Sequence, residues 1–529
     1  MSNEIADYEL LADEGSDIGS DDEIEDFDII NDRAGERIWS KEGNFVPKLH
    51  QFQEKPGPKN FRVENEQPID YFEWFIDSEF MDYVVKETNL YQQQHPLPSQ
   101  KKMAKWFDVT SNELSVFFAI VMLTGLVSKN ELKDYWSVDP LLNTPIFPKT
   151  FTRNRFLQIM RFLHFANNEQ KTNDKLFKIG NVVNMVKEKF KNAIIPDRNI
   201  CIDESLMLWK GRLSFKQYIP SKRHRFGIKL FEMVDCTTQC ILNFIIYTGK
   251  STKFRFHELL GISGSIVMEL MNMHLDKGHV LYVDNWYSSP PLFEILHYKK
   301  TGACGTLRKN RKGLPKYSGK MKKGELESYN TDKLLFQRWM DKREVFMLST
   351  IHRNGLVEST KTNFQSFEKI MKPKTVIDYS LFMGGVDYSD MRMSFSECVR
   401  KTTKWYKKFF FHIIDMVVHN AYCIYRAKNK SRIQLADFRL ILVRQLIEKY
   451  GSQRSERVGR PPLSENPLRL QGRHFPDKIP INSGDNGKKC CVVCSTSSDR
   501  KRTTIMCQLC DVPLCIVPCF KDYHTKVNL

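Results

Sequence analysis

Two short apolar segments, each with an aspartate at its end, constrain the fold of this chain more than any other feature. The first ends at Asp203 and the second at Asp284. Short apolar runs predict buried strands, and a carboxylate at the end of such a strand projects from the edge of a sheet. A third aspartate, Asp387, follows a pair of glycines, and Asp390 comes three residues later. A helix that begins at Asp387 would present both carboxylates on one face. Any one of these aspartates alone would more often be a turn or cap residue.

The elements expected between the first two aspartates indicate a fold class. Residues 227–234 and 240–247 are β-rich runs separated by a polar turn, which is typical of a hairpin. Residues 257–273 have a helical pattern and precede the strand that ends at Asp284. One strand, a hairpin, a helix and a further strand is the order of an RNase H-like core. The predicted fold is therefore an α/β, RNase H-like catalytic core whose adjacent strands end with carboxylates at one edge.

Carboxylates gathered at such an edge repel one another unless a cation lies between them. Mg²⁺ prefers oxygen ligands and keeps coordination positions available for phosphate. Two such ions would activate a water or a 3′-hydroxyl and stabilise the leaving oxygen of an in-line displacement. The pattern thus predicts phosphoryl transfer on nucleic acid. Glu204 is excluded from the predicted site because alternation along a strand points it away from Asp203.

The charge distribution supports a polyanionic partner. The net charge is +17, yet residues 1–32 hold thirteen acidic residues and no Lys or Arg, so the rest of the chain carries +30 (17 plus 13). A chain segment this basic is expected to bind the phosphate backbone of a nucleic acid. The alternative is a basic surface that only keeps the protein soluble. The acidic start is expected to be disordered, either as a solvating tail or as one that competes with DNA for the basic body.

The chain carries few signs of a membrane or of secretion. Its longest apolar run, residues 115–127, has 13 residues, which suits a buried helix better than a bilayer span. The first residues, MSNEIADYEL, lack the basic start and apolar run of a signal peptide. We therefore expect no membrane partner. Seven of the thirteen cysteines fall within the last 40 residues, which is typical of a metal module on a reduced intracellular protein.

The C-terminal cysteines have zinc-ligand spacing. Two CxxC pairs, followed by two further cysteines and a histidine, indicate two zinc ions, and the sulfur ligands select zinc over magnesium. Two closed sites require eight ligands, so either Cys490 or an unassigned histidine would supply the last. A purely structural or protein-binding finger is the alternative to a DNA-binding one, which the basic residues at 488, 489 and 500–502 favour. The seven expected ligands are Cys491, Cys494, Cys507, Cys510, Cys515, Cys519 and His524.

Several stretches taken together resemble the piggyBac-like transposases, a family of DDD-type cut-and-paste enzymes. The resemblance rests on CIDESLMLWKGRLSFKQYIPSKRHRFGIKL, YVDNWYSSPPLFEIL, GACGTLRKNRKGLP, MGGVDYSDMRMSF and RKTTKWYKK, which occur in family order. It implies that Asp203, Asp284 and Asp387 are the catalytic triad, with Asp390 as an additional carboxylate, and that Mg²⁺ or Mn²⁺ is the catalytic cofactor.

The resemblance also implies a reaction and its partners. The transposon would be excised through a hairpin intermediate and joined at TTAA targets by a homodimer in the nucleus, acting on double-stranded transposon-end DNA. The cysteine-rich segment is similar to the domain with which the family binds that DNA. The alternatives are a domesticated nuclear DNA-binding protein without transposition activity, and a generic RNase H-like nuclease.

Two basic segments are the expected DNA contacts. The first, at residues 308–312, could clamp phosphates near the metal site or be a solvated loop. In the second, at residues 400–405, a tryptophan beside lysines could stack on an unpaired base. The same tryptophan begins an apolar helical stripe and could instead belong to the core. The resemblance favours Arg308, Arg311 and the tryptophan. The expected DNA-binding residues are Arg308, Arg311, Lys312, Arg400, Lys401, Lys404 and Trp405.

Composition and pattern together divide the chain into successive regions. The two helical regions flank the catalytic core and are expected to form one dimerisation and DNA-binding domain, while basic strand-like material interrupts the core as an insertion. The expected boundaries are an acidic disordered tail at 1–50, helical regions at 51–198 and 397–450, catalytic parts at 199–305 and 375–396, a β-rich insertion at 306–374, a linker at 451–489 and a zinc domain at 490–529.

Overall fold

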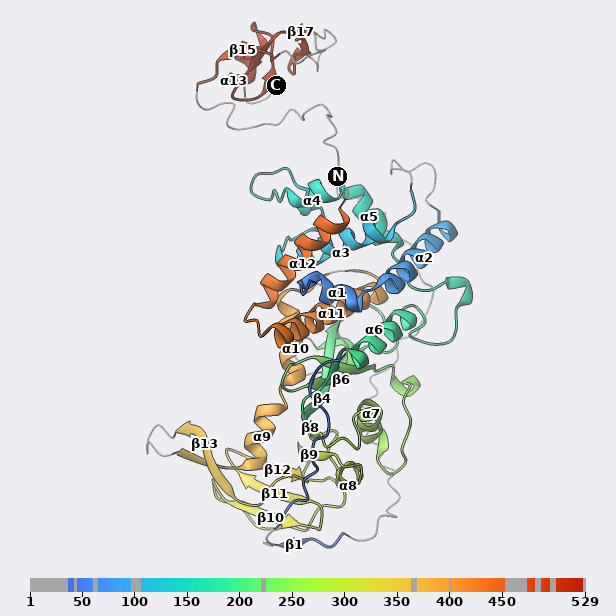
Figure 1. Ribbon diagram of the computed structural model, residues 1–529, viewed down its shortest axis with the longest axis vertical. Coiled ribbons are helices and arrows are strands. Elements are labelled where there is room, and N and C mark those ends of the chain that lie inside the picture. Colours follow the sequence, from blue (N-terminus) through green and yellow to red (C-terminus); the bar gives the residue numbers. More distant parts are fainter. Residues whose placement is uncertain are drawn as a thin grey trace. The chain divides into compact units, whose positions relative to one another are not determined.

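The structure is a computed structural model that describes residues 37–41, 45–59, 65–96, 106–219, 225–362, 369–398, 402–451, 473–480, 487–494 and 501–526. The chain divides into two compact units, Met1–Gly451 and Ser452–Leu529, and each is described by itself (Figure 1). The most acidic part of the expected N-terminal tail lies outside the described residues, as do Arg400, Lys401 and Arg500.

Five strands at the centre of the larger unit have the RNase H-like order that the sequence predicts. The order across the sheet is β7, β6, β4, β8, β9. β6 runs antiparallel to both β4 and β7, whereas β4, β8 and β9 run parallel to one another. The predicted fold class is therefore confirmed. The bounds are β4 Asn199–Leu208, β6 Phe226–Asp235, β7 Ile241–Ile246, β8 Val280–Val283 and β9 Gly302–Thr306.

The first strand of this core is longer than its apolar segment suggests. Its pairing with β8 ends at Ile202, but its pairing with β6 continues as far as Leu208. Asp203 consequently lies in the middle of β4 and does not end it. A polar residue is tolerated there because β8 has already ended, which leaves that side of the strand open.

Beyond β9 the sheet continues with strands from the predicted β-rich insertion. β12, β11 and β10 add to β9 in turn, each antiparallel to its neighbour. Together with β5 and the short β1 (Ser40–Lys41) at its two edges, they extend the central sheet to ten strands and are not a separate layer. A detached hairpin, β13 with β14, follows them. The bounds are β10 Leu326–Asn330, β11 Leu335–Met340, β12 Glu344–Ser349, β13 Leu356–Thr362 and β14 Lys369–Pro373, with the short β5 Gln217–Tyr218 at the opposite edge.

Helices from before and after the core pack together. α1 packs against α11 and α12, and α3 packs against α12, although hundreds of residues separate them in the chain (Figure 1). The predicted helical patterns on both sides of the core are thus present as helices. Their bounds are α1 Pro68–Phe75, α2 Ser78–Gln94, α3 Ser111–Leu126, α4 Ile146–Thr150, α5 Arg153–Phe162, α6 Gly180–Ala193, α11 Trp405–Asn429 and α12 Leu435–Tyr450; the core adds α7 Gly261–Met271, α8 Pro290–Tyr298, α9 Lys374–Phe382 and α10 Gly385–Phe395.

The apolar run at 115–127 is buried inside this helical region as most of α3. The helix begins at Ser111, and the hydroxyl of the preceding Thr110 caps it by accepting a hydrogen bond from the Glu113 amide at 3.2 Å. Gly125 lies in the last turn of α3. A Cβ there would lie 2.3 Å from the backbone oxygen of Ser396, so glycine permits this close approach. Within the part of the chain that the structure describes, no helix is long and apolar enough to cross a bilayer.

The described end of the expected tail is ordered. Arg37 forms a two-point ion pair with Glu294, with distances of 2.7 and 2.8 Å, and β1 (Ser40–Lys41) pairs with β10. We call residues 45–59 the strap. Its β2 (Gly57–Pro58) pairs with β3 (Ile194–Ile195). The expected disordered region, 1–50, is therefore too long at its C-terminal end.

The smaller unit is built from short strands and one helix. A three-stranded sheet has the order β15, β18, β19, and β16 pairs with β17. Its buried cluster consists mainly of cysteines with Leu514 and Tyr523. The bounds are β15 Pro476–Lys478, β16 Lys489–Cys490, β17 Arg502–Thr503, β18 Ile505–Cys507, β19 Val512–Pro513 and α13 Cys519–Thr525.

Candidate catalytic and zinc sites

Strand register places two of the predicted catalytic residues next to each other. Ile202 of β4 is paired with Val283 of the parallel strand β8. The next residue on each strand is an aspartate, so Asp203 and Asp284 occupy adjacent positions where β8 ends. Asp284 then starts a turn, in which its Oδ1 accepts a hydrogen bond from the Trp286 amide at 2.7 Å. The two aspartates are 81 positions apart in the chain, and the parallel pairing of β4 with β8 brings them together. Sequence spacing alone does not reveal this pairing.

The helix that carries the other two aspartates packs on the same strand. α10 packs against β4 and β6. Gly385 at its start fits closely, because a Cβ there would lie 2.6 Å from the sulfur of Cys201. Further along, the Ser205 hydroxyl donates a hydrogen bond to Oδ1 of Asp390 at 2.6 Å. Cys201, Asp203 and Ser205 share one face of β4. α10 therefore covers the face from which Asp203 projects.

Asp387 and Asp390 differ in their surroundings on α10. Asp387 is exposed in the first turn of the helix, whereas Asp390 is half-buried beside β4. The helix begins at Gly385, two residues earlier than expected. The four aspartates are not among the described groups whose ligand atoms all lie within 4.8 Å of one another. Side-chain rotation would be needed to close them around a single ion.

Burial controls the protonation of the two strand aspartates. Burial raises the pKa of Asp203 to about 9, and the charge of Glu204 adds to the effect. Burial likewise raises the pKa of Asp284, again with the Glu204 carboxylate as the next contribution. Neighbouring carboxyl groups that are this hard to ionise together fit a divalent cation, which would favour the charged form of each. The donor set consists entirely of oxygen and therefore fits Mg²⁺.

Glu204 contributes its charge to the site even though it was not predicted to belong there. Its Oε1 lies 3.4 Å from Nζ of Lys229, which in turn lies 4.9 Å from the centre of the Trp286 ring. The ion pair follows from strand alternation, since Lys229 is on the neighbouring strand. The sequence argument set Glu204 apart because strand alternation points it away from Asp203, and this was wrong: the two carboxyl groups lie within hydrogen-bonding reach, and each shifts the pKa of the other.

The first basic segment folds back onto the loop that follows Asp284. Nη2 of Arg311 donates to the backbone oxygens of Asn285 and Trp286, at 2.7 and 3.0 Å. Nε of Arg308 donates to the side-chain oxygen of Asn285 at 3.2 Å. Arg308 and Lys312 are exposed, whereas Arg311 is half-buried. This segment therefore has two parts, one that supports the loop and one that faces solvent beside it.

The second basic segment is only partly described. Lys404 precedes α11 and Trp405 is its first residue. The indole ring of Trp405 is half-buried and meets the Phe215 ring edge to face at 5.3 Å. One side of the tryptophan thus packs within the protein, as the core interpretation expects, and base stacking by the rest of the ring stays a prediction.

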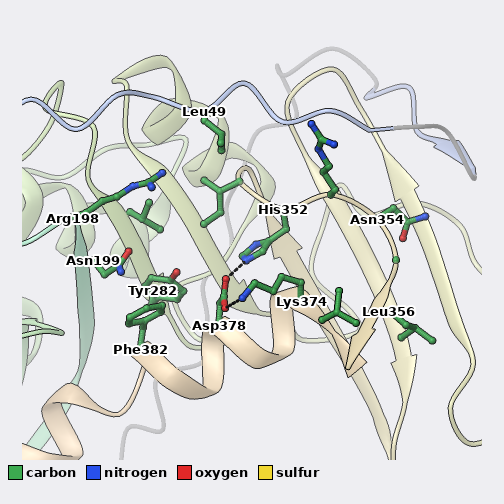
Figure 2. Close-up of a pocket in the computed structure, with 15 residues that line it drawn as sticks. Leu49, Arg198, Asn199, Tyr282, His352, Asn354, Leu356, Lys374, Asp378 and Phe382 are labelled. Carbon is green, nitrogen blue, oxygen red and sulfur yellow. Dashed lines mark hydrogen bonds and ion pairs between the residues drawn. The ribbon is translucent and has the colours of Figure 1, made fainter. Parts of the chain in front are cut away.

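The cavity drawn in Figure 2 lies at the opposite ends of the same strands. Its volume is about 490 Å³, and its lining includes Asn199 at the start of β4 and Val280 at the start of β8. Asp378 of α9 accepts hydrogen bonds there from His352 and Lys374, at 3.0 and 2.6 Å. The strand aspartates lie at the other, carboxyl-terminal end of β8. This concave site is therefore distinct from the aspartate cluster.

One group of four cysteines in the smaller unit has the geometry of a closed metal site. The sulfur of Cys494 lies 3.2 Å from that of Cys519 and 3.9 Å from that of Cys515. Tetrahedral zinc with bonds of about 2.3 Å to sulfur requires sulfurs about 3.8 Å apart. The backbone amide of Cys515 also donates to the Cys491 sulfur at 3.3 Å. These four residues, Cys491, Cys494, Cys515 and Cys519, lie within 4.8 Å of one another by their sulfur atoms.

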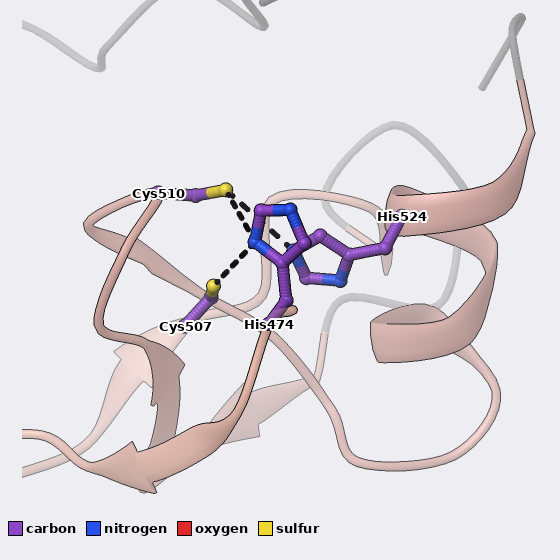
Figure 3. Close-up of side chains that lie close together, drawn as sticks. All are labelled: His474, Cys507, Cys510 and His524. Carbon is purple, nitrogen blue, oxygen red and sulfur yellow. Dashed lines mark hydrogen bonds between the residues drawn. The ribbon is translucent and has the colours of Figure 1, made fainter. Parts of the chain in front are cut away.

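A second group combines two cysteines with two histidines (Figure 3). Nδ1 of His474 lies 3.5 Å from the Cys507 sulfur and 3.4 Å from that of Cys510. Nε2 of His524 lies 3.6 Å from the Cys510 sulfur. Nδ1 of His524 donates to the Phe520 carbonyl at 2.7 Å, which leaves Nε2 as the ligand atom. This donor set suits tetrahedral zinc.

The eighth ligand position belongs to His474. The sequence argument counted seven candidates and left Cys490 or an unassigned histidine for the last. Cys490 is exposed and belongs to neither described group. The zinc unit consequently begins inside the expected linker, 451–489, because β15 and His474 lie there. The only sign of this ligand in the sequence was that seven candidates were found where two zinc sites need eight. His474 is far from the other seven in the chain, so no spacing motif identifies it.

Comparisons with known proteins agree with this architecture. A family model described as Transposase IS4 matches residues 67–422, and one described as a DDE_Tnp_1-like zinc finger matches residues 471–525. The chain is similar to human PiggyBac transposable element-derived protein 3, with 26% identity over 484 residues that cover 89% of this chain and 78% of that protein. Human PiggyBac transposable element-derived protein 2 is 24% identical over 441 residues, which cover 80% of this chain and 72% of that protein.

A solved structure shares the fold. It is the cryo-EM structure of a piggyBac transposase synaptic complex with hairpin DNA, with a TM-score of 0.71, 22% identity, and coverage of 87% of this chain and 98% of that one. The first family match spans well over half of the sequence, and the zinc-finger match covers the separate C-terminal unit. From these matches, together with the curated relatives, we conclude that the chain belongs to the piggyBac-like transposase family.

Proposed function

We propose that this protein is a cut-and-paste DNA transposase that excises a transposon through a hairpin intermediate and joins it to TTAA targets. The observation that carries the proposal is the adjacency of Asp203 and Asp284 on paired parallel strands, under a helix that bears Asp387 and Asp390. These carboxylates would hold Mg²⁺ or Mn²⁺, which supplies activation of the attacking oxygen and stabilisation of the leaving one.

The protein's own residues would position the DNA for these steps. Asp203 and Asp284 would be held ionised by the bound cation, while Ser205 fixes the direction of Asp390. Arg311 would keep the loop after Asp284 in place through its two backbone hydrogen bonds. Arg308 and Lys312, which are exposed beside this loop, would contact phosphates. Lys404 and Trp405, with Arg400 and Lys401 outside the described residues, would support the distorted hairpin tip.

The C-terminal unit would recognise transposon-end DNA. Its two groups of four ligands support the binding of two zinc ions, and Lys488, Lys489, Lys501 and Arg502 make its described surface basic. Holding two transposon ends together requires at least two copies of the active site, so we propose a homodimer. The same basic residues would serve import into the nucleus, where the substrate lies.

A domesticated DNA-binding protein is the second candidate. The observation that favours it is the naming of the human relatives as transposable element-derived proteins. Such a protein would bind DNA through the same basic surfaces without cutting it. The presence of all four aspartates in this chain supports the enzyme instead.

An excision and joining assay on the matching transposon ends separates the two. With Mg²⁺, the wild-type chain should nick the ends, form hairpins and join them to a TTAA-containing target. Asp284→Asn should reduce nicking at least about 10³-fold, because it removes a charged ligand of the cation that would activate the attacking oxygen and stabilise the leaving one. The matched control is Asp332→Asn, at an exposed aspartate in the turn between β10 and β11, which should leave nicking unchanged.

Three outcomes would contradict parts of the proposal. Equal nicking by wild type and Asp284→Asn would remove the site assignment. DNA binding without cleavage by the wild-type chain would support the domesticated protein. Cleavage without joining would indicate a nuclease and remove the transposase proposal.

A further inference from the structure

A third group of metal-ligating side chains lies away from the aspartates and in the larger unit, so it is separate from the two groups of the C-terminal unit. Its members are Glu54, His274 and His279, and one ligand atom from each lies within 4.8 Å of the others. They come from three separate places: the strap, the turn after α7, and the residue before β8. No role in DNA cleavage requires a histidine here, so the function proposed above leaves the group unexplained.

The ring of His279 is oriented by the backbone. It is fully buried, and its Nδ1 lies 3.1 Å from the carbonyl oxygen of Asp197. A carbonyl can only accept, so Nδ1 carries the proton. In the neutral ring Nε2 then presents a lone pair, and it faces Oε2 of Glu54 at 3.3 Å. Histidines that bind a metal through one ring nitrogen commonly donate the N–H of the other nitrogen to a backbone carbonyl.

Two acceptors that face each other at this distance need a positive charge between them. A tetrahedral ion with bonds of about 2.0 Å to nitrogen and oxygen holds its ligands about 3.3 Å apart, which matches the separation of Nε2 and Oε2. The other carboxylate oxygen of Glu54, Oε1, is already engaged by Nζ of Lys277 at 2.9 Å. The carboxylate is thus held with one oxygen turned toward the histidines.

His274 provides the third donor and an independent observation. Its Nδ1 is buried and has no hydrogen-bond partner among the described residues. A buried polar atom without a partner costs free energy that a ligand would recover. The His274 ring meets the His279 ring edge to face at 5.5 Å, so the two imidazoles share one small space.

The backbone around the group is built for a close crossing of the strap. The amide of Gln53 donates to the carbonyl of Lys277 at 3.0 Å. Gly278 has φ of +83°, and a Cβ there would lie 2.1 Å from the backbone oxygen of Gln51. Only glycine therefore lets the strap pass over this turn. From this crossing β8 leads directly to Asp284.

We propose that Glu54, His274 and His279 form a third metal site, which binds Zn²⁺ and fastens the strap to the turn before β8. Two imidazoles and a carboxylate are the ligand type that suits zinc, and water would complete the tetrahedron. The site lacks thiolates and has Lys277 beside it, so it binds zinc less tightly than the two groups of the C-terminal unit.

The test counts metal ions in the full-length chain after loading with Zn²⁺ and dialysis. Glu54→Gln and His274→Phe keep the size of each side chain and should each bind one ion fewer than the wild type. The matched control, His50→Gln, changes a strap histidine that pairs with His297 outside the group, and it should retain the wild-type count. All counts are repeated in the Asp284→Asn chain, which separates this site from the aspartate cluster and from the proposed activity.

Cobalt substitution identifies which site loses the ion. In Glu54→Gln and His274→Phe the thiolate-to-cobalt absorption of the cysteine sites should stay intact, while the weak visible absorption of one cobalt without sulfur ligands is lost. Equal ion counts in the wild type and both variants would overturn the proposal and leave an imidazolium–glutamate ion pair. Loss of the thiolate absorption together with the ion would also overturn it.

A gain-of-affinity variant guards against simple misfolding. Lys277→Met removes the cation nearest the site and should tighten binding of the third ion by roughly tenfold, because a like charge at this distance opposes the metal. If the group is only an ion pair held together by Lys277, the same substitution binds no additional zinc. Unchanged or weaker affinity in Lys277→Met would therefore also contradict the site.

Discussion

The aspartate cluster and the cysteine groups of the C-terminal unit both gather ligands for cations, but they do so by different physical means. The sulfur and nitrogen atoms of the C-terminal groups already lie 3.2–3.9 Å apart, at tetrahedral spacing. The aspartates are drawn from positions as distant as Asp203 and Asp390, and burial raises the pKa of both strand aspartates. In the C-terminal unit, the candidate ligands themselves form most of the buried cluster. In the aspartate cluster, the surrounding sheet holds the carboxyl groups near one another although their negative charges repel.

This difference suggests that metal binding serves the stability of the C-terminal unit, whereas the aspartate cluster does not stabilise the larger unit. The C-terminal unit has a small buried cluster made largely of the expected ligands themselves, so we expect its fold to depend on bound zinc. The aspartates stand on the large core of the sheet, which can hold like charges in unfavourable positions. Because ionisation of these carboxyl groups is unfavourable without a counter-charge, a divalent cation bound there would favour their charged forms, as the proposed function requires.

The largest expected effect concerns the metal-dependent region. Cys507→Ser should unfold the C-terminal unit while the larger unit keeps its melting temperature, because structural zinc contributes roughly 10–16 kcal/mol to such small folds. Two separate transitions in calorimetry, of which only one is lost, would support this. Cys490→Ser changes an exposed cysteine outside both groups and should leave both transitions in place. A shift of the larger unit's transition in Cys507→Ser would contradict the comparison.

For the aspartate cluster we expect the opposite response to loss of a ligand. Asp203→Asn should stabilise the chain at pH 8 without magnesium by about 3 kcal/mol. The pKa of Asp203 is raised from 3.8 to about 9, so its contribution is fully present below pH 3.8 and is lost as pH rises toward 9. Asparagine stays neutral and avoids that loss. Urea unfolding at pH 5 and pH 8 measures the difference, with Asp332→Asn as control; a destabilised Asp203→Asn at pH 8 would refute it.

A buried histidine in the helical region should respond to pH with the opposite sign. Burial lowers the pKa of His164 from 6.5 to about 3, and its Nε2 lies 3.0 Å from the Asn168 side-chain oxygen. The stability it supports is present above pH 6.5 and is lost as pH falls toward 3. His164→Gln should therefore lose roughly 3 kcal/mol less than the wild type between pH 7 and pH 4. Chemical unfolding at both pH values tests this, and parallel losses in the two chains would contradict it.

The smallest expected effects separate the two arginines beside Asp284. Arg311→Met should lower the single-turnover nicking rate about 10- to 100-fold with little change in DNA affinity, because it removes two hydrogen bonds to the loop. Arg308→Met should mainly weaken DNA binding and reduce its salt dependence by about one phosphate contact. Arg311→Lys should not restore the rate, since lysine lacks the planar fork. The same profile for both variants would contradict this division of roles between the two arginines.

Much of this architecture follows from local patterns. The apolar segments before Asp203 and Asp284, with a hairpin and a helix between them, were enough to predict the RNase H-like strand order. The CxxC pairs were enough to predict the zinc unit, since their ligands are close in sequence. His474 was missed because its contribution depends on a long loop closure. The length of β4 was missed because its pairing with β6 continues after the apolar pattern ends.

By itself, the sequence determined the order of the elements, the basic character of the chain and the residue types at the aspartate cluster and in the C-terminal unit, because periodicity and ligand spacing act over a few residues. Only the tertiary structure decided that Asp203 and Asp284 are neighbours, that Ser205 fixes Asp390, and that His474 completes a zinc group. It also decided the crossing of the strap over Gly278. Such contacts depend on strand register and on the packing of segments far apart in the chain, which a local pattern does not encode.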